Sequence, residues 1–381
     1  MKDRWHMLSD EERLFCDVLE RIVEEQIAPK AAQVDETSDF VHAQLDVLAK
    51  AGMLGANLPE EFDGSGVSAQ ALLRAVEIVA GGCGSTASAL TAHFLATDSI
   101  LLGGTQAQRA KWLPRAAQGE ALGAFALTEP TAGSDPADMK TRATRDGDGW
   151  RLKGSKCFIS NGGVADFLIV FAVTDPDARH RGISAFIVPK ETAGFDAGPP
   201  ERTMGLKGGH VFSLTFDCIL PADALLGEEG TGFRTAMKVL DNGRVEVAAQ
   251  CIGMAQTALD AAKAYAMDRV IGGEALSEKQ GIRWMLADMS LELETARLMA
   301  LEAARQRALG VRFSEAAAMA KLKASEVADM VADTALQIHG GYGYTRDFPI
   351  ERITRDLRIM RIYEGSSEIQ RNIIAGHLLA H

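Results

Sequence analysis

The feature that most restricts the fold is a block of short strand-like segments between two long helical regions. Within residues 122–228, apolar runs such as 167–171 and 183–188 are separated by glycine- and proline-rich turns, with no helical pattern between them. Before and after this block, apolar residues recur at helical spacing. This order predicts an α+β protein with a helical N-terminal domain (1–121), a middle β-barrel or sandwich (122–228) and a C-terminal four-helix bundle (229–381).

Composition narrows the class of protein. The chain has 381 residues, of which 47% are hydrophobic and 24% charged, as expected for a globular protein with a large core. A net charge of −12 argues against nucleic-acid binding, and an anionic substrate would need local arginines. No apolar run approaches a membrane span, and the N-terminus lacks a signal-peptide core. With five scattered cysteines and no CxxC pair, a reducing cytoplasm is the simplest compartment.

Two patterns that suggest ligand sites have simpler explanations. Gly82, Gly84 and Ala87 fit a loose G-x-G-x-x-A, but the preceding segment 73–79 is helical, whereas a dinucleotide fingerprint follows a strand. We therefore predict a turn between two helices. The eight histidines show no metal-binding spacing, so we predict no metal.

A carboxylate near the C-terminus is the first catalytic candidate. Glu364 lies on a Gly-Ser corner, and Ser367 with Gln370 has capping-box spacing, which predicts that a helix begins there. Proton removal next to a carbonyl requires a base beside preset N–H donors, which a helix start offers. The alternative is a carboxylate that only interacts with the helix dipole.

Three further segments have both a binding and a structural interpretation. The loop 127–135 is rich in hydroxyls and small residues, which suits close approach to a polar ring or phosphate, but a plain Pro-Gly connection is the alternative. The segment 337–344 ends a helix on three glycines, more than a helix C-terminus needs, and His339 is interpreted as a packed helix-end residue. Arg244 and Arg269 suit phosphate recognition, or pairing with local carboxylates such as Asp241.

Together these segments resemble the acyl-CoA dehydrogenase family over nearly the whole chain. Residues 126–135 are similar to its first signature, residues 337–356 (with Asp347, Arg352 and Asp356) to its second, and residues 363–366 to its catalytic segment. The resemblance implies a helical N-terminal domain, a middle β-barrel and a C-terminal four-helix bundle, with FAD between barrel and bundle. It also implies a homotetramer (a dimer of dimers) and an electron-transferring flavoprotein as acceptor.

The resemblance also assigns roles to residues. Those implied to bind the cofactor are Phe125, Leu127, Thr128, Gly133, Ser134, Phe158, Ile159, Ser160, Gln337, Gly340, Gly341, Ser366 and Glu368, with Arg269 and Gln280 serving the FAD of a neighbouring subunit. Those implied to contact the acyl-CoA are Ser134, Asp241, Arg244 and Gly365. Glu364 would be the base, because the other position used in the family is Gly243 here.

Three residues depart from the family pattern. Phe158 replaces a tryptophan that covers the flavin, as in the isobutyryl-CoA dehydrogenase branch, and together with Ser160 it favours short or branched acyl groups. Gly272 stands where an aromatic wall near the adjoining cofactor is typical, and Asp138 stands where a small residue is expected. None of the three removes a catalytic group.

The predicted function is FAD-dependent α,β-dehydrogenation of an acyl-CoA to the trans-2-enoyl-CoA, in fatty acid or branched-chain amino acid catabolism. Glu364 would remove the α-proton while flavin N5 accepts the β-hydride, and burial should raise the Glu364 pKa toward neutrality. A flavin-dependent acyl-CoA oxidase or monooxygenase on the same scaffold is one alternative. A non-catalytic helical scaffold or lipid-binding protein is the other, and would be colourless.

Overall fold

The N-terminal region of the computed structural model, which describes residues 5 and 7–380, is helical as predicted. Ser9 begins the first helix, because its side chain accepts from the Glu12 N–H and the Glu12 side chain accepts in return. The predicted turn between helices is confirmed at Cys83, which separates α4 from α5. The helices are α1 (Asp10–Ile22), α2 (Ala31–Thr37), α3 (His42–Lys50), α4 (Ala69–Gly82), α5 (Gly84–Gly103) and α6 (Gln106–Ala117).

The middle region is one curled sheet. Its strands are β1 (Gly123–Ala126), β2 (Arg142–Asp146), β3 (Gly149–Ser160), β4 (Phe167–Val173), β5 (Ile183–Pro189), β6 (Phe195–Pro200) and β7 (Val211–Leu220). β4 pairs with β5 on one side and with β1 and β2 on the other, and β3, β7 and β6 follow. In the described chain the edge strands β5 and β6 do not pair, so the predicted barrel is a half-barrel. Helices α5 and α6 supply the missing wall, since Ile100 and Trp112 share a core with Phe167 of β4.

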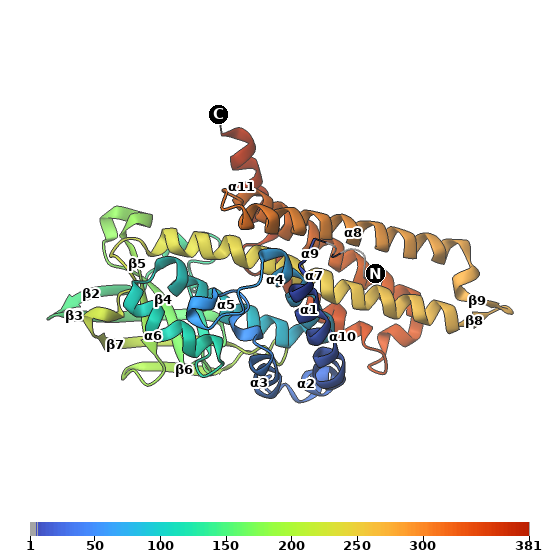
Figure 1. Ribbon diagram of the computed structural model, residues 1–381, viewed down its shortest axis with the longest axis horizontal. Coiled ribbons are helices and arrows are strands. Elements are labelled where there is room, and N and C mark those ends of the chain that lie inside the picture. The colour runs from blue at the N-terminus through green and yellow to red at the C-terminus, as the bar shows by residue number, and fades with distance from the viewer. Residues whose placement is uncertain (1–4, 6, 381) are drawn as a thin grey trace.

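The C-terminal region is built on three long helices: α7 (Gly232–Asp268), α8 (Gln280–Ala308) and α9 (Ser314–His339). A small hairpin, β8 (Val270–Ile271) and β9 (Glu274–Ala275), joins α7 to α8, and the shorter α10 (Ile350–Leu357) and α11 (Ser367–Leu379) pack on α9. Helix α4 of the N-terminal domain packs across α7 and α8. Figure 1 shows the sheet at one end of the molecule, the hairpin at the other and α7 running between them.

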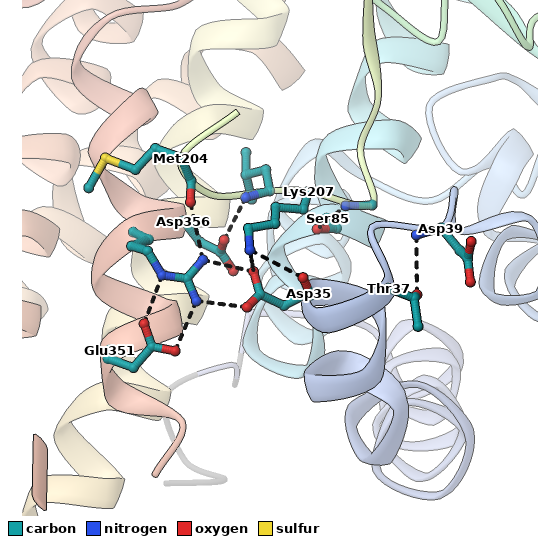
Figure 2. Close-up of polar contacts among 11 residues, drawn as sticks. Asp35, Thr37, Asp39, Ser85, Met204, Lys207, Glu351 and Asp356 are labelled. Atoms are coloured by element: carbon teal, nitrogen blue, oxygen red, sulfur yellow. Dashed lines mark hydrogen bonds and ion pairs between the residues drawn. The ribbon is translucent and has the colours of Figure 1, made fainter. Parts of the chain in front are cut away.

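A polar junction ties the three domains together (Figure 2). Arg355 of α10 donates to both carboxylate oxygens of Asp35 in α2, at 2.8 and 2.7 Å. Lys207, from the loop between β6 and β7, lies 3.6 Å from the same carboxylate. Asp356 accepts from the Leu206 N–H at 2.6 Å. Asp356, the last residue of the second signature, therefore anchors the middle domain to the helical region.

Candidate active site

A cavity of about 400 Å³ lies where the sheet, α5, α7 and the loop before α11 meet. It brings together many of the residues predicted for the site, namely Phe125, Leu127, Thr128, Gly133, Ser134, Phe158, Ile159, Ser160, Arg244, Glu364 and Gly365. The α5 residues on its wall are buried, whereas the loop 133–135 is exposed. The cavity therefore has a closed end at α5 and a mouth at the signature loop.

Side chains of α9 and α11 fix the backbone turn that carries Glu364. Glu364 and Gly365 both have positive φ (51° and 91°), and the side chain of Gln370 donates to both of their carbonyls, at 3.2 and 2.8 Å. Lys321 of α9 also donates to the Gly365 carbonyl, at 2.8 Å. The predicted capping box was wrong, because Gln370 serves these loop carbonyls and Ser366 is the residue that caps α11.

The Glu364 carboxylate is suited to proton transfer. Its Oε2 is buried and has no hydrogen-bond partner among the described residues. Burial raises the pKa of Glu364 to about 7, although the nearby charges of Lys321 and Arg244 pull it down. A carboxyl with a pKa near neutrality can both accept and release a proton at physiological pH.

Gly243 of α7 leaves the space that the Glu364 carboxylate occupies. A Cβ at this position would lie 2.2 Å from Glu364 Oε2 and 2.8 Å from Leu95 Cδ2, both far inside van der Waals contact. Gly243, the other base position that the resemblance implies, and Glu364 thus face each other across the same point. Glycine at 243 is what allows the carboxylate to enter from the α11 side.

The first signature loop is tied to β3 by a buried ion pair that the sequence analysis missed. Lys156 donates to Glu129 at 2.9 Å and to the Leu127 carbonyl at 3.0 Å, and the N–H groups of Lys140 and Thr141 also donate to Glu129. The sequence did contain a signal for this ion pair, because strand alternation places Lys156 on the inward face of β3 with Trp150 and Leu152. A buried lysine requires an acidic partner.

Phe158 forms an exposed aromatic platform at the cavity. The pairing of β3 with β7 shifts register between Lys156 and Ile159, and Phe158 in this bulge has a φ of 55°. Its side chain is 67% exposed. A bulky residue in the left-handed region is strained, and such strain is concentrated at ligand sites. This geometry fits a planar ring lying against the bulge.

Arg244 and Asp241 form the local pair considered in the sequence analysis, with Arg244 Nη1 2.5 Å from Asp241 Oδ1. Ser314 also donates to Asp241. Arg244 lines the cavity and its buried Nε has no partner in the described chain. The guanidinium therefore keeps one donor for a ligand.

The remaining predicted residues lie elsewhere. Arg269, Gln337, Gly340 and Gly341 line a second cavity of about 510 Å³, where a Cβ at either glycine would meet open space. His339 is buried and stacks on the Tyr265 ring at 4.5 Å, which confirms the packed interpretation.

Four other positions border neither cavity. Gln280 is the first residue of α8 and Glu368 is exposed in the first turn of α11. Gly272 has a φ of 66° in the β8–β9 turn, a backbone conformation that an aromatic residue rarely adopts. Asp138 is exposed and pairs with Lys140 at 2.6 Å.

Two kinds of site are absent from residues 5 and 7–380. No three His, Cys, Asp or Glu side chains there are grouped to hold a metal ion. No helix in that part of the chain is long and apolar enough to cross a membrane.

Comparison with known proteins identifies the family. The models of the N-terminal, middle and C-terminal domains of acyl-CoA dehydrogenase match residues 9–120, 124–219 and 230–379. The chain belongs to the acyl-CoA dehydrogenase family, a family of FAD-dependent oxidoreductases.

Individual relatives agree with this. The chain is 40% identical to the short-chain specific acyl-CoA dehydrogenase of Clostridium acetobutylicum, over 97% of this chain and 98% of that protein. It is similar to the structure of butyryl-CoA dehydrogenase from Megasphaera elsdenii, with a TM-score of 0.96 and 40% identity over 98% of this chain and 99% of that one. It is equally similar to a chain in a structure described as the electron transferring flavoprotein of Acidaminococcus fermentans (TM-score 0.96, 40% identity, 98% and 99% covered).

Proposed function

We propose that this protein dehydrogenates a short acyl-CoA between Cα and Cβ, with Glu364 as the base that removes the α-proton. The observation that carries the proposal is the buried, unpartnered carboxylate oxygen of Glu364 at the wall of the cavity, with its pKa raised to about 7. An α-proton next to a thioester is weakly acidic. The reaction therefore needs a base that is neither neutralised by an ion pair nor solvated by water.

The residues at the sheet side of this cavity fit FAD. Phe158 offers an exposed aromatic surface, Gly133 leaves open space for close backbone approach, and hydroxyls come from Thr128, Ser134 and Ser160. FAD bound here would supply the hydride acceptor, its N5. Gln337, Gly340 and Gly341 line the second cavity with Arg269, so they would hold the diphosphate and adenosine end of a neighbouring subunit's FAD, and Ser366 and Glu368 would also contact the cofactor. Arg269 and Gln280 would reach the FAD of a neighbouring subunit.

The chain itself supplies the groups that act on the thioester. The Glu364 carboxylate takes the α-proton, and the Glu364 backbone N–H donates to the thioester oxygen, where negative charge grows as the proton leaves. Gln370 and Lys321 fix the corner from which both groups project, so little reorganisation is needed. Ser134, Asp241, Arg244 and Gly365 would contact the CoA part.

The closed end of the cavity favours a short acyl group. Thr91 of α5 lines it and accepts from the Gln250 side chain at 3.0 Å, while the Tyr363 hydroxyl lies 3.3 Å from Gln250 Oε1. A longer alkyl chain would have to displace this hydrogen-bonded group, leaving buried polar atoms unpaired. The wall limits length and leaves branching near the thioester open.

We also propose a homotetramer. Trp284, Leu291 and Leu298 are exposed on α8 at seven-residue intervals, so they form one apolar stripe along the helix. The cavity lined by Arg269 and Gln337 shares no residue with the cavity at Glu364, as expected if subunits complete each other's cofactor sites. By analogy with the Acidaminococcus fermentans structure, the electron acceptor is an electron-transferring flavoprotein.

The test is anaerobic bleaching of the protein-bound flavin by butyryl-CoA, with longer, branched and dicarboxylic acyl-CoAs for comparison. Glu364→Gln should slow bleaching about 10²- to 10⁴-fold while the protein stays yellow. Glu302→Gln, on the exposed face of α8, is the matched control and should bleach normally. Bleaching of Glu364→Gln at the wild-type rate would refute the role of Glu364. Colourless protein would refute the flavoprotein, and rapid peroxide formation in air would indicate an oxidase.

A further inference from the structure

Lys156, the buried lysine of β3, bonds to two different groups of the first signature loop. Its residue exposure is 1%, and its ammonium donates to Glu129 Oε1 at 2.9 Å and to the backbone carbonyl of Leu127 at 3.0 Å. Glu129 also accepts from the N–H groups of Lys140 and Thr141. The Leu127 carbonyl accepts no other hydrogen bond among the described residues. Lys156 is therefore one donor of several to Glu129 but the single donor to this carbonyl.

The bond to Leu127 fixes the direction of the next N–H group along the chain. The Leu127–Thr128 peptide is planar and trans, so its C=O and N–H point in opposite directions. Because Lys156 holds the C=O, the Thr128 N–H points away from Lys156. This N–H has no acceptor in the part of the chain that the structure describes, and Thr128 lines the cavity at Glu364. Thr128 therefore keeps a backbone donor for a ligand.

The same segment of β3 produces the bulge at Phe158. Between Lys156 and Ile159 the pairing with β7 shifts by one residue. Within this shift the Cys157 N–H donates to the Thr128 carbonyl, at 3.0 Å, and Phe158 follows with a φ of 55°. A bulky residue keeps such a φ only where the surrounding contacts impose it. Here Lys156 and Cys157 hold the carbonyls of two consecutive loop residues, so the loop and the bulge fix each other.

We propose that Lys156 is a positioning residue of the flavin site: through the Leu127 carbonyl it aims the Thr128 N–H at the flavin ring, and with Cys157 it holds the bulge that presents Phe158. The proposal rests on the flavin site proposed above. Lys156 does not touch the flavin itself, because its side chain is fully buried and does not line the cavity. Its effect must therefore appear in how tightly the flavin is held and in the surroundings of the ring.

The charge of Lys156 and its bond to Leu127 are separate properties. Burial lowers the pKa of Lys156 to about 8, although Glu129 opposes this, so the ion pair is what keeps the buried amine charged. The bond to the Leu127 carbonyl needs only an N–H, which a neutral amine also has. The stability of the fold thus depends on the pair, whereas the placement of the flavin depends on one donor.

Loss of the Lys156 donor should turn the peptide that carries the Thr128 N–H. Leu127 is buried, with an exposure of 7%, and a buried carbonyl without a donor is costly. The Leu127–Thr128 peptide would therefore rotate toward another donor. The Thr128 N–H would rotate with it, because the two groups belong to one rigid plane.

The experiment compares two variants that separate stability from flavin binding, using flavin-loaded protein at a temperature where each variant is folded. Glu129→Gln keeps the bond from Lys156 to Leu127. It should be less stable in urea but should release FAD at the wild-type rate and keep the wild-type absorption spectrum of the bound flavin. Glu129→Gln combined with Lys156→Met should recover much of the stability, yet release FAD about tenfold faster and show a shifted spectrum, because about one hydrogen bond to the ring is lost.

Lys153→Met is the matched control, since Lys153 lies on the outward face of the same strand with its side chain 70% exposed. It should match wild type in stability, release rate and spectrum. A double variant with the wild-type release rate and spectrum would overturn the proposal. Fast release in Glu129→Gln that the double variant restores would also overturn it, because flavin binding would then only follow stability. Colourless wild-type protein would instead refute the proposed function, and the flavin site with it.

Discussion

Two glutamates with buried carboxylate oxygens, Glu364 at the wall of the cavity and Glu129 within the first signature segment, behave in opposite ways. The carboxylate of Glu129 is buried, and it accepts hydrogen bonds from Lys156 at 2.9 Å and from two backbone N–H groups. Burial raises its pKa, but Lys156 and the backbone donors outweigh burial and the net pKa is lowered. Glu364 has an oxygen with no partner in the described chain, and its pKa is raised to about 7.

The difference shows that burial alone does not make a carboxylate reactive. Both side chains are largely removed from water, so desolvation acts on both. A lysine and two N–H donors convert Glu129 into a structural anchor, whereas the nearby charges of Lys321 and Arg244 lower the pKa of Glu364 by less than burial raises it. The proposed reactivity of Glu364 follows from the lack of a hydrogen-bond partner for its Oε2 within the described chain.

The largest expected effect comes from removing the partner of Lys156. Glu129→Gln leaves a buried ammonium without its counter-charge and should lower the free energy of unfolding by about 3–5 kcal/mol. Glu364→Gln removes no partnered charge and should not destabilise the protein. Urea denaturation of the flavin-loaded proteins at neutral pH compares the two.

A double variant provides the control for that comparison. Glu129→Gln combined with Lys156→Met replaces the unpaired ammonium with an apolar side chain of similar volume and should recover much of the lost stability. If Glu129→Gln alone were as stable as wild type, the anchoring role of the pair would be wrong.

Filling the space opposite Glu364 should have the next largest effect. In Gly243→Ala the new Cβ would lie 2.2 Å from Glu364 Oε2, so the carboxylate must move. Overpacking of this kind costs about 1–3 kcal/mol, and displacement of the base should slow flavin bleaching by about tenfold or more. Gly376→Ala is the control, because a Cβ in that turn of α11 meets open space. An unchanged bleaching rate in Gly243→Ala would show that the carboxylate reacts from another position.

Much of this architecture could be predicted from the sequence, because it depends on local pattern. Helical and strand periodicity predicted the order of a helical region, a sheet and a second helical region, and the Gly-Ser corner made Glu364 the candidate base. The predicted barrel is present as a half-barrel, since helices α5 and α6 cover a face that further strands would have closed. The predicted Ser367–Gln370 capping box was wrong, because the Gln370 side chain donates to the Glu364 carbonyl, which lies outside the helix.

The long-range contacts around the site could not be predicted from the sequence, for a different reason. Lys156 meets Glu129, and Lys321 meets the Gly365 carbonyl, only once distant segments have packed together. Spacing along one chain carries no record of such pairs. What the sequence did offer was a charged residue on the inward face of a strand, which shows that a partner exists but not which residue it is.

The pH dependence of the two glutamates should run in opposite directions. The pKa of Glu364 is raised from an ordinary 4.5 to about 7, so its neutral form is the stabilising one. That contribution is complete below pH 4.5 and is lost as the pH rises through about 7, while kcat/KM rises over the same upper range because the base must be ionised. The lowered pKa of Glu129 makes its contribution complete above its unfolded value and lost only in acid.

Melting curves of wild type and Glu364→Gln across this range check the sign. Glu364→Gln should gain stability relative to wild type between pH 4.5 and about 7, since glutamine has no charge to bury. A constant difference over this range would mean that Glu364 titrates near its ordinary pKa. It would then resemble a solvated carboxylate, and the contrast with Glu129 would weaken.

The smallest expected effect on stability is at Phe158, the exposed aromatic at the cavity that Glu364 lines. Phe158→Ala removes a side chain that is already 67% exposed, so the unfolding free energy of the FAD-free protein should change by no more than about 0.5 kcal/mol. Phe158→Gly should stabilise slightly, because glycine adopts the φ of 55° without strain. Both variants should release FAD more readily than wild type, whereas Ile219→Ala, an exposed position on β7 outside the cavity, should not. Dialysis followed by flavin absorbance measures the retention. Equal retention in all four proteins would mean that the strained bulge at Phe158 is not a flavin platform, and that only the glutamates distinguish this cavity from an ordinary domain interface.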